Sequence, residues 1–363
     1  MEKHKIKSYI KQIRGVSYKP DDLCDVLDNS SVILLRANNI EDGIINFDSI
    51  QYVRKSKVSS EQYLKKGDIL ICASSGSKSL VGKAASFDFD IECTFGAFCK
   101  VIRPKDGYSQ YLSVFFQSQS YRQKISEFAI GANINNIRNE HIDELYISMY
   151  PESERCFIVK KVNTVQSIIY WRKYMIKKLD ELIKARFVEM FCNKGYPVLG
   201  WNDVFNTTTG KLDSNAMVEN GDYPFFTCAK EVFRIDKYAF EQEALILAGN
   251  NAAGKYDVKY YKGKFNAYQR TYILSLKQDW SYRLFQYQLE DKLVYLQKQS
   301  LGGLTKYLTL KILGDLSFII PPIDKQAYFE KFVEQVNKSK VEVQKALDKA
   351  QLLFDSLMQK YFG

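Results

Sequence analysis

Two long stretches of the chain place apolar residues at alternating spacings of four and three, which is typical of the seam of a coiled coil. The first stretch, residues 152–191, contains no Gly or Pro and repeats the spacing at Ile158, Val162, Val165, Ile169, Ile176, Leu179 and Ile183. The second, residues 324–362, repeats it at Phe329, Phe332, Val336, Ser339, Val343, Ala346, Ala350, Leu353 and Leu357, with Asp324 as a candidate N-cap. Because one apolar seam is unsatisfied in water, we expect the two helices to pack on each other.

The regions before and between these helices show the pattern of short strands. Runs of β-branched and aliphatic residues at 31–35, 68–71, 244–247 and 271–274 are separated by Gly, Asn and Asp turns. The chain therefore divides into a β-rich region, a helix, a second β-rich region and a second helix. This order predicts an α+β fold with boundaries at residues 1–150, 151–192, 193–322 and 323–363.

Three landmark pairs recur at one constant offset, which indicates an internal repeat. Gly131 and Gly302 are 171 residues apart (302 − 131), and the pairs Leu145 with Leu316 and Pro151 with Pro322 keep that offset. Two copies of one domain-plus-helix unit imply pseudo-two-fold symmetry. Duplex DNA is the most common partner that shares such symmetry.

Composition indicates the cellular compartment of the chain and the class of its partner. The net charge of +10 and a pI near 9.0 favour a polyanion, with nucleic acid ahead of an anionic membrane. No apolar run reaches the ~18 residues of a membrane-spanning helix, and the charged start MEKHKIKSYIKQIRG is not a secretory signal. Seven irregularly spaced cysteines without a C-x-x-C pair predict free thiols in the cytoplasm. With only His4 and His141, a His-rich zinc site cannot be assembled, and we expect no metal site.

Each β-rich region contains a strand followed by a small-residue loop that ends in Gly-Lys. These segments read GDILICASSGSKSLVGK and ALILAGNNAAGK. The second matches most of a phosphate-binding P-loop, but Tyr256 replaces the Ser or Thr that Mg²⁺ needs, and no helical pattern follows. We interpret both as loops that approach a phosphodiester, with a plain surface hairpin as the alternative. The candidate DNA contacts here are Ser77, Lys78, Lys83, Asn250, Asn251, Lys255, Tyr256, Gln269 and Arg270.

A polar segment precedes the Pro at the entrance of each long helix. In the first copy, GANINNIR supplies Asn133, Asn135, Asn136 and Arg138, residue types that hydrogen-bond adenine, guanine or phosphate. In the second copy, GGLTKYLT supplies Thr305, Lys306 and Tyr307. The alternative is that Asn133 or Asn135 caps a helix. A helix N-terminus also binds phosphate, so the two interpretations are compatible.

The ends of the long helices carry a resemblance to a known family. LDELIKARFVEMF at 179–191, the closing DSLMQKYFG, the GDILI strand and the Pro at each helix entrance resemble the specificity subunit of type I restriction-modification systems. The resemblance implies two target-recognition domains, 1–150 and 193–322, separated by two conserved helices that form an antiparallel coiled coil. Each domain would read one half of a split, asymmetric target in double-stranded DNA. The second helix departs from the pattern, because only its terminal aromatic residue matches well.

The resemblance also implies the partners. The helices would dock two methyltransferase (modification) subunits, and restriction and translocase subunits would join through them. S-adenosylmethionine, ATP and Mg would be used by those partners, so we expect this chain to be non-catalytic, to bind no cofactor and to contact no membrane. One alternative is a coiled-coil scaffold with two β-rich domains that bind peptides or glycans, and binding to DNA that weakens steeply with salt would exclude it. Another is a fused nuclease or methyltransferase fragment, which would turn over alone.

Overall fold

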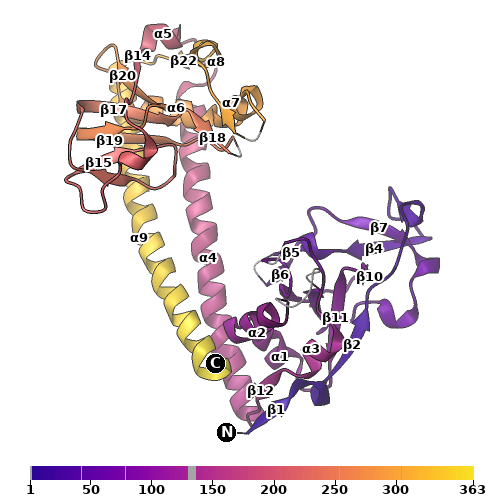
Figure 1. Ribbon diagram of the computed structural model, residues 1–363. Helices are drawn as coiled ribbons and strands as arrows, with labels where there is room; N and C mark the ends of the chain where they lie inside the picture. The colour runs from indigo at the N-terminus through magenta and orange to yellow at the C-terminus, as the bar shows by residue number, and fades with distance from the viewer. Residues whose placement is uncertain (1, 42, 78, 130–135, 253, 304) are drawn as a thin grey trace. The chain divides into compact units, whose positions relative to one another are not determined.

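The computed structural model describes residues 2–41, 43–77, 79–129, 136–252, 254–303 and 305–363 (Figure 1). These residues form two compact units. The first comprises Met1–Lys173 with Lys345–Gly363, and the second comprises Tyr174–Gln344. Each unit therefore contains one β-rich region together with part of each long helix. No described helix is long and apolar enough to cross a lipid bilayer.

The two predicted long helices are confirmed as α4 (Glu152–Phe191) and α9 (Ile323–Phe362). In the first unit, Ile158 and Val162 of α4 share a buried cluster with Met358 and Phe362 of α9. Further along α4, Val165 and Ile169 pack with Ala350, which lies earlier in α9. In the second unit, the cluster joins Ile183, Phe187 and Phe191 to Phe329, Val333 and Val336. Because residue numbers rise along α4 as they fall along α9, the pairing is antiparallel.

The seam on α9 departs from the strict heptad that the sequence suggested. Leu353 is 51% exposed, whereas Ala350 and Met358 are buried. Ala350, Phe354 and Met358 are spaced four residues apart, which is longer than the 3.5-residue average of a heptad, so the buried face moves off the seven-residue repeat. The N-cap prediction for Asp324 is also wrong, because α9 begins at Ile323 and Asp324 lies in its first turn.

The first unit contains two four-stranded sheets. One has the order β2-β11-β8-β9 and is antiparallel throughout. The other has the order β10-β4-β7-β3, in which β10 and β4 are parallel. The strand bounds are β2 Ile10–Arg14, β3 Leu23–Cys24, β4 Ser31–Leu35, β7 Gln51–Arg54, β8 Ile69–Cys72, β9 Ala84–Ser86, β10 Cys93–Phe95 and β11 Cys99–Pro104. Short pairs join β1 (Lys3–Lys5) to β12 (Tyr146–Ser148) and β5 (Ile40–Glu41) to β6 (Ile44–Ile45).

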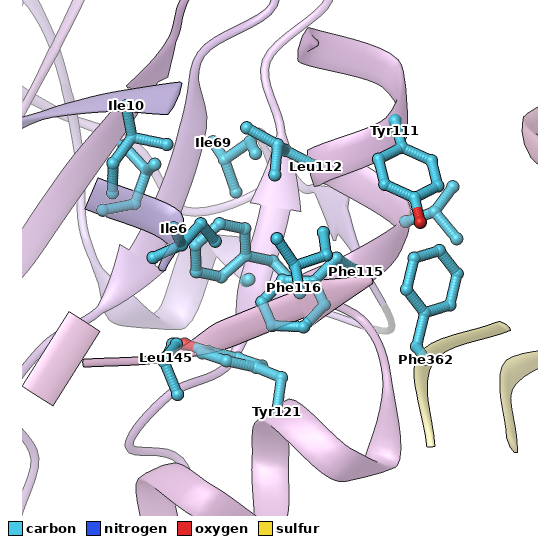
Figure 2. Close-up of a cluster of buried hydrophobic side chains, with 14 of the residues drawn as sticks. Ile6, Ile10, Ile69, Tyr111, Leu112, Phe115, Phe116, Tyr121, Leu145 and Phe362 are labelled. Atoms are coloured by element: carbon cyan, nitrogen blue, oxygen red, sulfur yellow. The ribbon is translucent and has the colours of Figure 1, made fainter. Parts of the chain in front are cut away.

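Three short helices and the end of α9 close the largest core of this unit. They are α1 (Ser109–Phe115), α2 (Gln119–Ala129) and α3 (Asn139–Asp143). Figure 2 shows Phe362 of α9 facing Tyr111 of α1, and their ring centroids lie 5.2 Å apart. Both side chains are buried, so the aromatic end of α9 fastens the long helix to the β-rich domain.

The second unit is built on one six-stranded sheet with the order β14-β20-β17-β19-β15-β16. The bounds are β14 Phe205–Thr209, β15 Tyr223–Phe226, β16 Phe233–Ile235, β17 Phe240–Ala248, β19 Val258–Ala267 and β20 Thr271–Leu276. The helices are α5 Trp201–Val204, α6 Tyr282–Asp291, α7 Leu293–Gln299 and α8 Leu310–Gly314. Short pairs join β13 (Val198–Gly200) to β22 (Ser317–Ile319) and β18 (Asn250–Asn251) to β21 (Lys306–Tyr307).

The strand pairings confirm the internal repeat. The pair β1–β12 of the first unit recurs as β13–β22 of the second, and β12 and β22 are offset by 171 residues (317 − 146). The run β2-β11-β8-β9 corresponds to β14-β20-β17-β19. The parallel pair β10–β4 corresponds to β19–β15. In the second unit the single strand β19 therefore takes the places of both β9 and β10 of the first unit. Because β19 pairs with β17 and with β15, the second unit has one continuous sheet where the first has two.

Candidate nucleic-acid interface

In the first unit, three segments meet where the central strand β8 ends. The loop after β8 forms a β-bridge between Ser74 and Asn136, and the backbone N–H of Ile137 donates to the carbonyl oxygen of Ala73 at 2.7 Å. The turn before β11 joins them, because the carbonyl oxygen of Phe98 accepts from the backbone N–H groups of Ala73 and Ser74 at 2.9 and 3.0 Å. The Ser-rich loop and the described end of the Asn-rich segment, which begins at Asn136, are therefore neighbours.

The second unit builds the same junction with different residues. Here β18 (Asn250–Asn251) pairs with β21 (Lys306–Tyr307), and the carbonyl oxygen of Gly249 accepts from the Leu308 N–H at 2.8 Å. The turn before β20 contributes again, since the Gly249 N–H donates to the carbonyl oxygen of Arg270 at 2.9 Å. We call these two junctions the convergent surfaces of the two domains. The first consists of the loop after β8, the turn before β11 and the segment that begins at Asn136, and the second consists of β18, β21 and the turn before β20.

Most of the predicted contact residues on the convergent surfaces are open to solvent. Those that are exposed are Ser77, Asn136, Arg138, Lys255, Gln269, Arg270, Thr305 and Tyr307, and those half-buried are Asn250, Asn251 and Lys306. The Lys255 backbone N–H donates to Oδ1 of Asn251 at 3.2 Å, which fixes the loop beneath its side chain. Lys78, Asn133 and Asn135 lie outside the described residues.

Two predicted DNA contacts lie elsewhere. Tyr256 is only 7% exposed and belongs to the hydrophobic core of the second unit, because its ring packs among aliphatic and aromatic neighbours rather than following the loop into solvent. Lys83 immediately precedes β9 and lines a cavity of about 350 Å³ together with Gln166 of α4 and Gln351 of α9.

A buried lysine anchors the first convergent surface. Lys100 of β11 is 6% exposed, and its Nζ donates to Oε1 of Gln12 at 3.0 Å and to Oδ1 of Asn139 at 2.6 Å. Gln12 in turn donates through Nε2 to the carbonyl oxygen of Asn139 and to Oδ1 of Asp143. This network holds the end of the segment that carries Asn136 and Arg138. Burial lowers the pKa of Lys100 from 10.5 to about 8, although the nearby Asp143 and Glu140 favour its charged form.

This lowered pKa predicts a pH dependence of stability. Between about pH 8 and 10.5 the unfolded chain holds a proton on Lys100 that the folded chain has lost, so the free energy of unfolding rises with pH. Lys100→Met lacks the titrating group. We expect the unfolding free energy of wild type minus that of the variant to grow by up to about 3 kcal/mol across this window. Denaturant titrations at several pH values measure it, and a difference independent of pH would contradict the prediction.

A cavity that the sequence did not predict lies beside the first convergent surface. It has a volume of about 500 Å³ and is lined by Tyr18, Arg36, Ala37, Asn38, Ser74, Ser75, Gly76, Gly96, Phe98 and Cys99. Arg36 and Asn38 follow β4 in the run RANN, and Phe98 lies in the turn before β11. The one available signal was this cluster of polar residues directly after a buried strand, which sequence spacing alone did not connect to the Ser-rich loop.

Comparisons with known proteins agree with the fold. Residues 193–352 match the family model described as the type I restriction modification DNA specificity domain. The chain is 38% identical over 173 residues to the type I restriction enzyme EcoKI specificity subunit of Escherichia coli K12, and 36% identical over 173 residues to the StySPI specificity subunit of Salmonella potsdam. Each match covers 47% of this chain and 37% of the relative, so the chain spans well under half the length of these relatives.

Solved structures extend the likeness to the whole chain at the level of fold. The S subunit of a type I restriction-modification system from M. genitalium has a TM-score of 0.63 at 16% identity and covers 100% of this chain and 96% of its own. A chain from a study of complex assembly and conformational transition of the type I R-M system has a TM-score of 0.50 at 16% identity, with coverage of 98% and 97%. The resemblance to the specificity subunits is therefore confirmed.

Proposed function

We propose that this chain, a relative of the type I restriction-modification specificity subunits, binds duplex DNA and reads a bipartite, asymmetric target. The observation that carries the proposal is the convergent surface, which is built twice on the same strand pairings but from different side chains. Two surfaces with one backbone plan and different exposed residues suit two half-sites of different sequence. The net charge of +10 supplies the attraction to phosphate that any such binding needs.

The exposed and half-buried residues of the convergent surfaces divide by chemistry into positioning and reading roles. Lys255 and Arg270 of the second domain carry charges suited to phosphate, which fixes register without specifying sequence. Asn136 of the first domain and Asn250 of the second carry amides suited to the donor and acceptor pair of adenine in the major groove.

The partners follow from the same proposal. We infer that α4 and α9 dock methyltransferase subunits, that restriction and translocase subunits join through these, and that the complex works in the cytoplasm. The first unit offers a surface for a protein on α4, where the apolar side chains Phe157, Ile168 and Trp171 are 54%, 42% and 57% exposed. S-adenosylmethionine, ATP and Mg would be used by those partners. The proposed role of this chain is recognition without catalysis.

The direct test is methylation mapping of the complete complex. The chain is co-purified with its methyltransferase subunits and incubated with genomic DNA and S-adenosylmethionine, and the methylated positions are sequenced. We expect one motif with two fixed halves and a spacer of fixed length. A contiguous motif, or methylation without sequence preference in an active complex, would contradict the proposal.

A single lysine tests the role of the second convergent surface. Lys255 is exposed on the loop fixed by Asn251, so Lys255→Ala is expected to weaken binding equally for all DNA sequences. The slope of log affinity against log salt should fall by about one unit, because one fewer counterion is released. Lys194→Ala removes an exposed lysine of the same unit from the turn after α4 and is the matched control. Equal salt slopes for the two variants would exclude a phosphate contact at Lys255.

A further inference from the structure

We propose that the cavity beside the first convergent surface takes the edge of one base of the first half-site, and that Arg36 reads that base as guanine. The inference rests on the proposed function, because it assigns a reading residue to one recognition domain. The cavity shares Ser74 with the bridge to Asn136, so a duplex lying on the convergent surface reaches it. Its volume of about 500 Å³ leaves room for a base edge and its ordered water.

Arg36 presents an uncompensated charge to this cavity. Its Nη2 donates to the carbonyl oxygen of Ser49 at 3.3 Å, and its Nε is buried without a hydrogen-bond partner. Across the described part of the chain no carboxylate forms an ion pair with the Arg36 guanidinium. An unmatched guanidinium with a buried, unpaired N–H costs free energy in the free protein. Because Nε has almost no exposed surface, a ligand in the cavity would accept hydrogen bonds from the terminal Nη groups of the guanidinium.

The backbone around Arg36 is held in advance of binding. Asn39 is 1% exposed, and its Oδ1 accepts from the Arg36 backbone N–H at 2.8 Å. Its Nδ2 donates to the carbonyl oxygen of Asn46 at 2.9 Å, and its backbone N–H closes the turn onto Arg36. Residues Ala37–Asn39 thus form a fixed 3₁₀ turn rather than a loose loop. A fixed turn loses little conformational entropy on binding, and it fixes the backbone position from which the Arg36 side chain extends.

Small residues keep the cavity open to a close approach. The wall contains Ala37, Ser74, Ser75 and two glycines. A Cβ on Gly96 would lie 3.3 Å from the Tyr18 ring, whereas a Cβ on Gly76 would meet no heavy atom within 4 Å. Phe98 is 69% exposed at the rim and offers an apolar face to a sugar or to a thymine methyl group.

The chemistry of the charge selects the base. A guanidinium presents parallel N–H groups that match the O6 and N7 acceptors of guanine in the major groove, and this is the most common specific contact in protein–DNA complexes. Lysine cannot supply the same planar pair of donors. A phosphate oxygen would also accept from Arg36, but such a contact carries no sequence information, so the two outcomes separate experimentally.

The experiment selects duplexes with a randomised first half-site on the complete complex with its methyltransferase subunits. For Arg36→Ala we expect preference for guanine at one position to fall by about 10- to 100-fold, with the second half-site and the spacer unchanged. Arg36→Lys keeps the charge and the aliphatic stem, so it retains the fold and is expected to lose the same preference. Arg54→Ala is the control and should leave the motif unchanged. Arg54 is an exposed residue of β7 whose backbone is paired with Ser31, at the opposite end of β4 from Arg36.

Two results would overturn the assignment. One is an unchanged motif in both Arg36 variants. The other is a uniform loss of affinity for all sequences in Arg36→Ala, with a salt slope lower by about one unit, which would identify a phosphate contact. A wild-type complex that selects no bipartite motif would instead count against the proposed function. Thermal unfolding of each variant confirms that the compared complexes are folded.

Discussion

Exchanging residues 196–322 for the corresponding segment of a relative is expected to change one half of the methylated motif completely and to leave the other half unchanged. The exchanged segment contains the whole six-stranded sheet and its convergent surface. The first domain has its own sheets, and its core around Tyr111, Leu112 and Phe116 also includes residues of the two long helices. Because no sheet among the described residues contains strands of both domains, each surface should read its half-site independently. Methylation mapping of the chimeric complex measures the outcome.

The exchanged segment shares one hydrophobic cluster with the two long helices, and the exchange has to preserve it. Leu284 and Tyr287 of α6 pack on Phe187, Phe191 and Phe329 of the two long helices, so the donor segment needs apolar side chains at these two positions. The reciprocal exchange of residues 1–150 is the matched control and should change only the opposite half of the motif. If either exchange altered both halves in a folded complex with its spacer intact, independent reading would be excluded.

The long helices could be predicted from sequence because their periodicity is sustained over many turns. The pattern was wrong at Ser339 and Leu353, two predicted seam positions of α9 that are exposed. Near Leu353 the buried face of the helix leaves the seven-residue repeat. The short helices inside the β-rich regions were missed. α6 begins at an N-cap, Ser281, whose Oγ accepts from the Leu284 N–H, but its ten residues are too few for the period to stand out among neighbouring strands.

The candidate site, too, could be predicted only in part from the sequence. Loops marked by Gly, Asn and Lys were recognised because turn chemistry is local, and the structure brings their described parts together. Tyr256 was misplaced because a tyrosine after a loop carries no local sign of which face it will take. Arg36 was missed because Ser74 and Phe98, which line the same cavity, are distant from it in the chain, and the parallel pairing of β10 with β4 helps to bring these segments together. Contacts created by sheet topology leave no spacing pattern in the sequence.

Removing the carboxylate of Asp68 is expected to destabilise the first unit strongly. The Asp68 side chain is 2% exposed and receives a bidentate contact from Arg103, with Nε to Oδ1 at 2.8 Å and Nη2 to Oδ2 at 2.7 Å. The Lys65 backbone N–H donates to Oδ2 at 2.8 Å, so the pair also fixes the turn before β8. Asp68→Asn leaves the Arg103 guanidinium, itself 19% exposed, without its counter-charge. Breaking one partner of a buried pair costs about 3–5 kcal/mol.

Two variants distinguish the loss of the buried ion pair from the effect of substitution itself. Glu61→Gln breaks the contact between Lys11 and Glu61, which is equally short at 2.7 Å but has side chains 60% and 61% exposed, and should change stability little. The double variant Asp68→Leu with Arg103→Met removes both charges and should recover most of the loss, because no unpaired charge stays buried. Hydrogen exchange of β8 and β11 in the full chain reports the first unit specifically. Exchange protection in Asp68→Asn equal to that in Glu61→Gln would show that the buried pair does not hold this sheet, and that its strands are stabilised by apolar packing alone.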